Sequence, residues 1–536
     1  MEEPKMQNPQ PPPPQTAASL IRHGSALSLL TFASRILGLI REMVKARFLG
    51  TTALSDAFSV AFLLPNLFRR LFAEGSISVA FIPTFKEYLL EANREKVREF
   101  LSCMFTFLTF IVTIFVCAGI LAAPLLVRIF GVEEFDETVF LTRIMFPFLG
   151  FISIAALFQG VLNSLHIFTP SGLAPILLNI ATIICAYALS PYTANPARAM
   201  AAGVLIGGFL EAAIQLPFVI KNGQTFFITG LKRAFNNPGV RKTLRLVGPT
   251  IIGMAAYQIN DLVSTALAGR AGEGIVSSLQ YSLRLQELFL GVFAVSIGTV
   301  LLPNLTEYAK TSRWDIYNKR LISSINIIAL ITIPVTFFAL MEGQSLIRLL
   351  FQSHSFDETS VALTMAAFTF HMPGLLFIAL NRIIAPAFYA QSDTKSPTLA
   401  GILSFAVNIS LASVLVGQFR GAGIAFALTA ASAVNTILLI VFLGRNPNIK
   451  LGSVAGPALL YILKILILSA LAIIPVYFLS PVLRAIFAGH ARIVSFGIPL
   501  ALCAIVYIAL GLVMLALVKD KYFTGIINMI RKRTSD

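Results

Sequence analysis

Long apolar stretches separated by short polar segments dominate the chain from about residue 25 onward. A helix needs roughly 20 mostly apolar residues to cross a bilayer, and these stretches reach that length. They predict an all-α polytopic membrane protein with fourteen transmembrane helices, the second of which continues in broken form to about residue 90. The predicted spans are 25–47, 54–72, 100–127, 139–165, 172–191, 198–219, 243–268, 275–303, 320–346, 360–389, 397–416, 421–444, 456–480 and 492–518.

The polar segments differ in charge between the two sides of the predicted membrane. An even number of spans places both termini on one side, and the loops and tails of that side contain most of the Lys and Arg residues. Because positively charged loops stay in the cytoplasm, both termini are expected to be cytoplasmic. The first 22 residues are proline-rich and do not have the pattern of a secretory signal. The opposite loops contain only Arg128, Arg198, Arg270, Arg348, Arg420, Arg484 and Arg492.

An internal repeat relates the two halves of the chain. The run FGVEEFDET at 130–138 recurs as FQSHSFDET at 351–359, and Pro147 recurs in the same order as Pro373. Six spans per copy give both copies the same orientation in the membrane, as in transporters whose site lies between two parallel repeats. A duplication that was kept only for packing is the alternative interpretation.

The repeat and the composition shifts divide the chain into four predicted regions. A disordered cytoplasmic tail precedes an N-lobe of six spans, and a basic cytoplasmic loop introduces a C-lobe of six more. Two extra helices and a basic tail follow, and these lie outside the repeat. The boundaries are 1–22, 23–222, 223–446 and 447–536.

Composition supports a membrane protein and excludes several other classes. Hydrophobic residues make up 57% and charged residues 12% of the chain, whereas soluble domains contain about 25% charged residues. The formal net charge of +16 therefore does not indicate a nucleic-acid-binding protein. The four cysteines lie inside apolar runs, the five histidines are scattered, and no HExxH or Walker A motif occurs. We therefore expect no disulfide framework, no His/Cys metal centre, no catalytic residues and no enzyme activity.

Several cations lie within predicted spans, where each charge near the bilayer centre costs about 2.5–3.5 kcal/mol on insertion scales. In the first span, Ser34, Gly38, Arg41 and Lys45 follow one stripe of a helix, with Arg35 beside it. A stripe of this kind cannot face lipid, so we expect it to line an interior. The flanking Glu42 belongs to the same segment.

The second and eighth spans add further polar residues. Asp56 begins the second span, and Pro65 predicts a kink before Arg69. In the eighth span, Arg284 and Glu287 are spaced to pair on one helix face. A buried ion-pair network between the halves is one interpretation of these charges. The surplus of cations over acids favours an anionic ligand instead, and the arginine fork suits phosphate oxygens.

Four blocks of sequence resemble one known family. They are SRILGLIREMVKARFLG at 34–50, the run from SDAFSVAFLLPNLFRR to IP at 55–83, GTVLLPNLTEY at 298–308 and PAFYAQSDTKSP at 386–397. These resemble the MurJ (MviN) lipid II flippases of the multidrug/oligosaccharidyl-lipid/polysaccharide exporter superfamily, and the likeness extends over the chain after the proline-rich tail. The resemblance implies two six-helix lobes with two extra helices. It also implies transport of lipid II, the undecaprenyl-pyrophosphate disaccharide-pentapeptide, from the cytoplasmic to the periplasmic leaflet of the bacterial inner membrane.

The resemblance also implies a set of site residues. The essential cavity arginines of the family match Arg35, Arg41, Arg69 and Arg284, and its acidic and polar positions match Glu42, Asp56, Glu74, Ser277 and Glu287. The chain departs from the family pattern at Leu63, Leu283 and Ala412. Some relatives bind sodium, and Asp261, Asn408 and Thr429 match that arrangement, although a hydrogen-bonded core pair of Asp261 with Asn260 is an equal alternative.

The predicted mechanism is alternating access of two lobes, with the pyrophosphate on the arginines and the polyprenyl tail in an apolar groove of the last two spans. Membrane potential and Na⁺ are the candidate driving forces, and lipid II and other wall-synthesis proteins are the candidate partners in peptidoglycan synthesis and cell shape. A flippase for another polyprenyl-diphosphate oligosaccharide stays open. A drug exporter for organic cations would need carboxylates in its cavity, whereas this one is rich in arginine. A membrane enzyme acting on lipid-linked sugars is a further alternative, but the sequence contains no HxxxxD or DDxxD motif. If the protein were a scaffold for wall-synthesis enzymes, variants of the cavity residues would stay functional.

Overall fold

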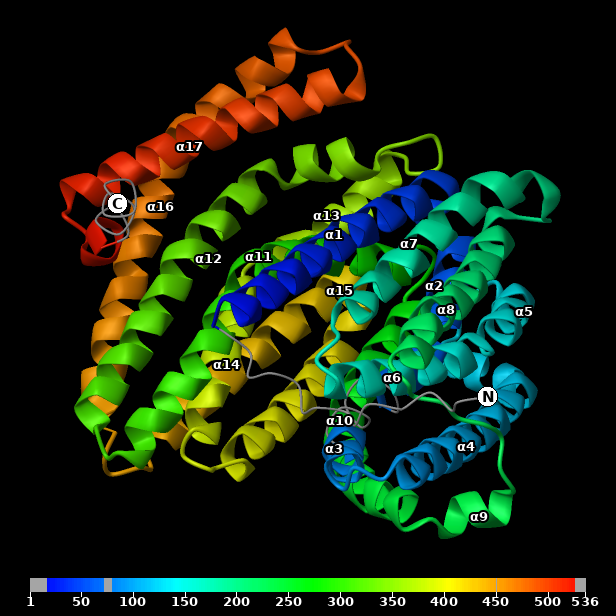
Figure 1. Cartoon of the computed structure of the whole chain (residues 1–536). Helices are drawn as coiled ribbons and strands as arrows, with labels where there is room; N and C mark the ends of the chain where they lie inside the picture. The colour runs from blue at the N-terminus through cyan, green and yellow to red at the C-terminus, as the bar shows by residue number, and fades with distance from the viewer. Residues whose placement is uncertain (1–16, 72–79, 450, 526–536) are drawn as a thin grey trace. The chain divides into compact units, whose positions relative to one another are not determined.

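The computed structural model describes the backbone of residues 17–71, 80–449 and 451–525, and the side chains of these residues outside 17–28, 249–257 and 291–300. Within the described residues the chain is helical and contains no β-strand (Figure 1). The α-helices are α1 (Ala17–Leu49), α2 (Ala53–Arg69), α3 (Ile82–Leu90), α4 (Arg94–Arg128), α5 (Phe135–Met145), α6 (Phe148–Ser164), α7 (Thr169–Leu189), α8 (Pro196–Lys221), α9 (Leu231–Asn236), α10 (Pro238–Arg270), α11 (Ile275–Lys310), α12 (Trp314–Phe351), α13 (Glu358–His371), α14 (Gly374–Tyr389), α15 (Lys395–Leu443), α16 (Leu451–Ile486) and α17 (Ile498–Leu517).

Within the described residues each predicted span is largely helical, which confirms the fold class of an all-α membrane protein, although spans 139–165 and 360–389, predicted as continuous, are each broken into two helices. By length and hydropathy, 8 of the described helical segments can cross a membrane, or 9 when α13 and α14, bent by 45°, count as one span. α15 covers two predicted spans and is interrupted at Arg420, whose φ of 44° and ψ of −126° are not helical. This break lies where the sequence predicts the loop between spans eleven and twelve. The exact number of fourteen spans stays a prediction.

The internal repeat has a structural counterpart in two broken helices. Pro147 precedes the first residue of α6, and Pro373 precedes the first residue of α14. In both copies the preceding helix ends two residues before the proline, at Met145 and at His371. Since proline lacks the backbone N–H that would continue the ladder, the same residue type produces the same break in both halves.

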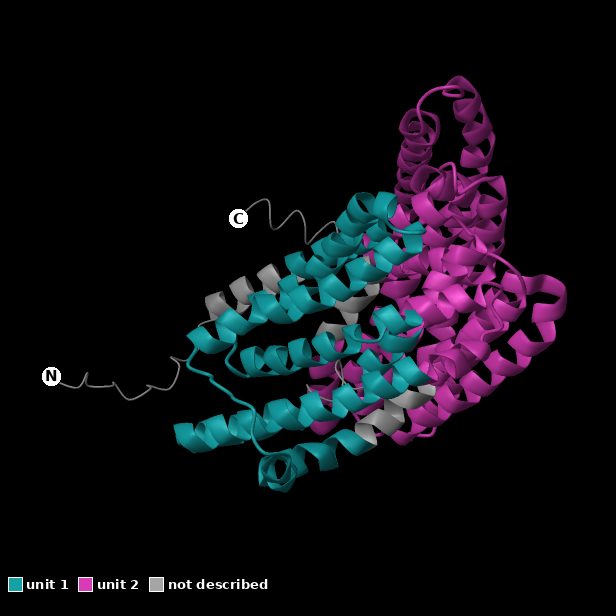
Figure 2. Ribbon diagram, turned by 90° about the vertical axis from the view of Figure 1, so that its right-hand side faces the viewer, with its two compact units in different colours: residues 1–41, 64–121, 142–254 teal, residues 42–63, 122–141, 255–536 magenta. Residues whose placement is uncertain are grey.

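The described chain separates into two compact units (Figure 2). Unit 1 comprises residues 1–41, 64–121 and 142–254, and unit 2 comprises 42–63, 122–141 and 255–536. The unit boundaries therefore fall inside α1, after residue 41, and inside α2, after residue 63. Arg35, Arg41 and Arg69 belong to unit 1, whereas Arg284 belongs to unit 2.

Two details of the N-terminal region extend the sequence expectations. α1 begins at Ala17, inside the region that the proline-rich pattern predicts as a disordered tail, because Ala17 and Ala18 lie beyond the last proline of the tail and favour helix. α2 continues past Pro65 to Arg69, so the expected kink does not end the helix. Residues 72–79, which include Glu74, lie outside the described residues.

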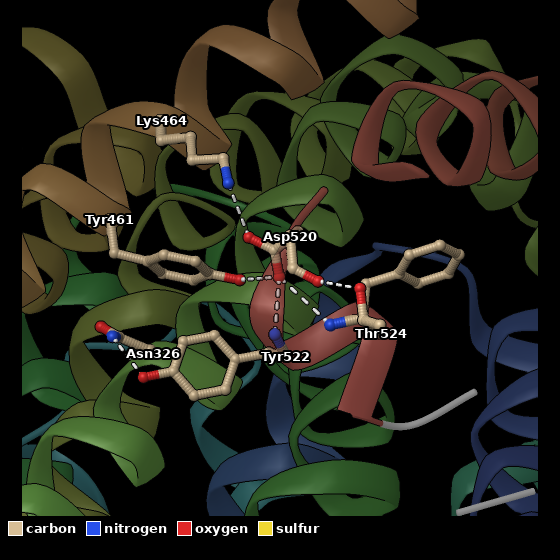
Figure 3. Close-up of polar contacts among 7 residues, drawn as sticks. Asn326, Tyr461, Lys464, Asp520, Tyr522 and Thr524 are labelled. Carbon is tan, nitrogen blue, oxygen red and sulfur yellow. Dashed lines mark hydrogen bonds and ion pairs between the residues drawn. The ribbon is translucent and has the colours of Figure 1, made fainter. Parts of the chain in front are cut away.

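A buried carboxylate fastens the segment after α17 to α16 (Figure 3). Asp520 accepts a hydrogen bond from Lys464 Nζ at 2.7 Å and one from the Tyr461 hydroxyl at 3.2 Å. Its side chain is 1% exposed. Tyr522, two residues later, accepts a hydrogen bond from Asn326 Nδ2 of α12 at 2.9 Å. The two last helices are thereby held to each other and to α12 at this end.

Hydrogen bonding also sets the charge state of this carboxylate. Burial acts to raise the pKa of Asp520, but hydrogen bonds from Lys464 and from the backbone amides of Phe523 and Tyr522 hold that pKa below its usual value. A folded-state pKa below the unfolded value means that the stabilisation is complete above about pH 4 and is lost as pH falls through the folded pKa.

Replacing Asp520 with asparagine is expected to lower stability by about 1–3 kcal/mol, because Lys464 loses its ionised partner. Thermal unfolding of the detergent-solubilised chain, followed by circular dichroism, measures the change. The neighbouring exposed Lys519→Gln is the matched control and should unfold as the wild type does. Equal melting of the Asp520→Asn and wild-type chains at pH 7 would show that this contact does not fasten the helices.

Candidate substrate-binding site

One face of α1 is polar and turned away from the exterior. On this face Gly38 and Lys45 are buried, and Ser34 and Arg41 are partly buried. Four large apolar side chains of the same helix are exposed and follow the opposite face. They are Leu29, Phe32, Ile36 and Ile40. This two-faced pattern is the arrangement expected of a helix with lipid on one side and an interior on the other.

In unit 1, the neighbours of two predicted site segments are defined. Arg69, in the last turn of α2, donates from Nε to Asn66 Oδ1 at 2.7 Å. Asn179 of α7 donates from Nδ2 to the Ser34 carbonyl of α1 at 3.3 Å. Arg35 and Arg41 follow Ser34 on α1 and are partly buried. These contacts position the Arg69 side chain and the α1 backbone next to Arg35.

In unit 2, Asp56 of α2 caps the N-terminus of α11. Its Oδ2 accepts from the backbone N–H of Gly274 at 2.8 Å, and its Oδ1 accepts from the backbone N–H of Ser277 at 2.8 Å. The Asp56 side chain is buried, at 3% exposure. The first N–H groups of a helix have no partner within the helix and carry partial positive charge, so a carboxylate there is doubly favourable. The structure thus brings the predicted residues Asp56 and Ser277 together in a helix cap.

Lys45 is the buried cation of this region. Its ammonium donates to Ser59 Oγ at 2.5 Å and to Gln280 Oε1 at 3.1 Å, and it lies 4.9 Å from the ring centre of Tyr281. The residue is only 3% exposed. Neutral oxygens and a π face can hold a buried ammonium. We interpret Lys45 as a link that joins α1 to α2 and α11 and so holds in place the helix that carries Arg284.

Tight backbone packing completes the support of α11. The Tyr281 hydroxyl donates to the Gly50 carbonyl at 3.0 Å. Gly50 has a φ of +57°, and a Cβ atom there would lie 1.8 Å from the Ser355 carbonyl oxygen. Only glycine fits both the left-handed conformation and this approach. The turn between α1 and α2 is thereby locked against α11.

Arg284 lies one turn beyond this buried segment of α11. Its Nη1 is 3.3 Å from Glu287 Oε2, with 28% of the Arg284 and 60% of the Glu287 side chain exposed. The spacing predicts this pair, and the structure contains it. A long, exposed pair of this kind stabilises weakly and leaves the guanidinium able to bind another anion. The helix α11 therefore carries three of the predicted site residues, Ser277, Arg284 and Glu287. Asp56 of α2 fixes the first turn of this helix.

The predicted sodium ligands have separate neighbours. Asn408 of α15 donates from Nδ2 to Asn260 Oδ1 at 2.7 Å and to Ser264 Oγ at 3.2 Å. Its Oδ1 is buried with no hydrogen-bond partner in the described part of the chain. Thr429 donates to the Phe370 carbonyl at 2.7 Å. A buried oxygen without a hydrogen-bond partner can coordinate a small cation, so the Asn408 side chain is suited to be a sodium ligand. Asp261 is the residue after Asn260, to which Asn408 donates its hydrogen bond.

An apolar pocket of about 200 Å³ opens among α12, α14, α15 and α16. Leu451, Ala455, Leu459 and Ile462 contribute the α16 wall, and Ile325, Leu380, Ile384 and Ile440 line the other sides. The outer face of α16 continues this surface with exposed side chains such as Leu460, Leu463 and Ile467. A long hydrocarbon chain is the kind of ligand that such a surface accommodates.

Sequence reasoning identified the charged site residues but not their supports. Tyr281 and Gln280 share a face with Arg284, which the eighth-span pattern indicates, but their contacts with Gly50 and Lys45 join positions far apart in the chain. The signal that could have located the support is the pair of glycines Gly50 and Gly274, which flank polar segments and both adopt positive φ.

Comparison with known proteins identifies the relatives of this fold and site. The model of the family described as "Lipid II flippase MurJ" matches residues 45–516. A probable lipid II flippase MurJ of Treponema pallidum is 43% identical over 523 residues, covering 96% of this chain and 99% of the relative. A lipid II flippase MurJ of Burkholderia cenocepacia is 32% identical and covers 80% of this chain and 84% of the relative.

Solved structures share the fold. A lipid II flippase MurJ in an inward closed conformation aligns with a TM-score of 0.76 and 24% identity, covering 92% of this chain and 99% of that one. An inward-facing multidrug resistance transporter of the MATE family and MOP superfamily aligns with a TM-score of 0.62 and 15% identity, covering 79% and 94%. Both similarities extend over most of the chain, so the chain shares the fold of these two structures.

Proposed function

Because the chain belongs to the lipid II flippase MurJ family, we propose that it moves lipid II across the bacterial cytoplasmic membrane, from the cytoplasmic to the outer leaflet, for peptidoglycan synthesis. The chain is a multi-span membrane protein, and it shares its fold with a solved lipid II flippase structure. Lipid II combines a pyrophosphate, a sugar–peptide headgroup and a polyprenyl tail. The function therefore requires cations that bind the pyrophosphate, a polar interior for the sugar–peptide headgroup and an apolar surface for the polyprenyl tail.

The pyrophosphate is assigned to the arginines. The position of Arg284 is the main support for this proposal, because α11 holds this residue in a defined place. Its ion pair with Glu287, at 3.3 Å, is exposed and weak, so the guanidinium can bind a phosphate instead. Arg35, Arg41 and Arg69 of unit 1, all partly buried, supply further cations. Glu42, Glu74 and Glu287 are proposed to meet the polar headgroup. Bound pyrophosphate can shift the chain from one conformation to another only if it binds the two conformations with different affinity, which is the requirement for alternating access.

The polyprenyl tail is assigned to α16 and its neighbours. The apolar pocket beside Leu459 and Ile462 and the exposed apolar face of α16 support this assignment. The tail would then stay in contact with lipid while the headgroup crosses. We further propose that both termini are cytoplasmic, as the excess of cations on their side favours. An inside-negative potential of 100 mV would then favour outward movement of each negative charge by about 2.3 kcal/mol.

A flippase for another polyprenyl-diphosphate oligosaccharide is the closest alternative, because it would use the same cations and the same tail surface. Competition for binding distinguishes the two. Purified protein in detergent should bind lipid II more tightly than an undecaprenyl-diphosphate oligosaccharide that lacks the stem peptide. Equal or weaker binding of lipid II would contradict the proposed substrate and favour the alternative.

We propose Na⁺ as a coupling ion held beside Asn408, with Asp261 and Thr429 as further ligands implied by the family resemblance. The buried, unpartnered Oδ1 of Asn408 supports a cation there. Na⁺ is expected to raise the melting temperature of the wild-type chain relative to an equal concentration of choline. Asn408→Ala should remove this difference, while Asn318→Ala, which alters an asparagine on α12, should preserve it. A Na⁺ effect that survives Asn408→Ala would contradict the proposed site.

A further inference from the structure

A second pocket, with polar residues in its lining, is found where α16 connects to α17, far along the chain from the proposed substrate site. It has a volume of about 450 Å³ and is formed by this connection together with the residues after α12. It belongs wholly to unit 2. The polar residues that line it are Gln352, Ser353, Arg484, His490, Arg492 and Ser495.

The pocket lining carries positive charge and no carboxylate. Arg484 is paired with the buried Glu342 at 2.8 Å. Arg492 is exposed, its Nη1 donates to the Gln352 carbonyl, and within the described part of the chain no carboxylate lies within ion-pair distance of it. A guanidinium whose protein contact is only a neutral carbonyl keeps its full charge for an anion.

Surplus hydrogen-bond donors accompany this charge. The Nε atoms of Arg484 and of the neighbouring Arg348 are buried without a hydrogen-bond partner in the described residues. Arg348 lies 5.7 Å from the ring centre of Phe496, which also lines the pocket. Residues Ile493–Gly497 form a π-helical turn, a conformation that occurs often at functional sites. Arg348 and Arg484 are each paired with a carboxylate, Glu358 and Glu342, so the surplus positive charge at this connection comes from Arg492 and the two Nε atoms are additional donors.

Apolar side chains surround the polar hollow. Phe478, Val482 and Ile486 on the last turns of α16 are between 54% and 67% exposed, and Ile493 at the start of the connection is 72% exposed. A soluble anion would make no use of these side chains, whereas an amphiphile with an anionic head would cover them with its chains. The combination matches the interface of a membrane, where head groups and acyl chains meet.

We propose that this pocket binds the phosphodiester head group of an anionic phospholipid, with its acyl chains against the exposed face of α16. Arg492 is the principal contact of the phosphate, and Arg484, His490 and Ser495 complete the polar lining. The bound lipid would brace the connection between the last two helices. The inference does not depend on the identity of the transported substrate.

Native mass spectrometry of the purified full chain with added lipids tests the proposal. Phosphatidylglycerol should bind more tightly than phosphatidylcholine, and glycerol 3-phosphate, which presents the head without chains, should not bind measurably. Arg492→Gln should weaken phosphatidylglycerol binding about tenfold, as expected for loss of one charged hydrogen bond, and Arg492→Lys should weaken it less.

Arg128→Gln is the matched control, since it removes one exposed arginine outside the pocket and should leave binding unchanged. His490→Gln provides a second pocket variant and should weaken binding in the same direction. Equal binding of phosphatidylcholine, or unchanged phosphatidylglycerol binding by Arg492→Gln, would overturn the proposal. Binding of glycerol 3-phosphate as tight as that of the lipid would also overturn it, by identifying a site for soluble anions.

Discussion

Arg284→Ala is expected to abolish the ability of this chain to support growth of a bacterium depleted of its own lipid II flippase. The substitution removes the cation that α11 holds in place, and with it a bidentate contact to the pyrophosphate. Hydrogen bonds between charged groups contribute about 1.5–3 kcal/mol each, so losing two of them would weaken binding by roughly a hundredfold or more. Growth on depletion, with immunoblots of membrane fractions to verify protein amounts, measures the effect.

Arg382→Ala is the matched control for Arg284→Ala. Arg382 also lies in a predicted span of unit 2 but is exposed on α14, so its loss should leave growth unchanged. Arg284→Lys should restore part of the function, because a lysine keeps the charge but not the planar fork. Full growth of the Arg284→Ala strain at normal protein levels would show that this residue is not part of the anion site.

Asp56→Ala is expected to produce the largest loss of stability. The substitution leaves the backbone N–H groups of Gly274 and Ser277 buried without their acceptor, at a cost of roughly 1–3 kcal/mol for each. It also removes the negative charge at the N-terminus of α11. The expected result is a lower melting temperature in detergent and, because α11 is less well fixed, weaker lipid II binding through Arg284.

Two further variants make this result specific. Asp56→Asn keeps one acceptor oxygen and should fall between Asp56→Ala and the wild type. Asp315→Ala removes an exposed carboxylate from the first turn of α12 and should change the melting temperature little. If Asp56→Ala and Asp315→Ala melt alike, the cap does not support α11 as described.

Apolar periodicity was sufficient to predict the helices, but spans 139–165 and 360–389 were predicted as continuous, without the breaks that the structure contains. The two proline breaks at Pro147 and Pro373 follow from local chemistry, because proline cannot continue the hydrogen-bond ladder. The stripe on α1 was also predictable, since a helix that carries Arg41 and Lys45 on one face must turn that face from lipid. The break within α15 was predicted by the loop signal near Arg420.

Contacts between distant residues were beyond the reach of the sequence. Asp56 was identified as a site residue, but its acceptor role at Gly274 and Ser277 depends on how α2 packs against α11. The same holds for Lys45, whose partners Ser59 and Gln280 lie on two other helices. Local patterns give the face of each helix, whereas tertiary packing decides which polar groups on those faces satisfy one another.

Leaflet accessibility of labelled lipid II in reconstituted vesicles tests the central claim most directly. Lipid II placed in one leaflet should become accessible to a membrane-impermeant reagent on the other side when the wild-type chain is present. Vesicles that contain Arg284→Ala at equal protein density should retain the label as protein-free vesicles do, while Arg382→Ala should behave as the wild type. The claim that this chain moves lipid II through Arg284 would be contradicted if the Arg284→Ala chain relocated lipid II at the wild-type rate. It would also be contradicted if the wild-type chain relocated no lipid II.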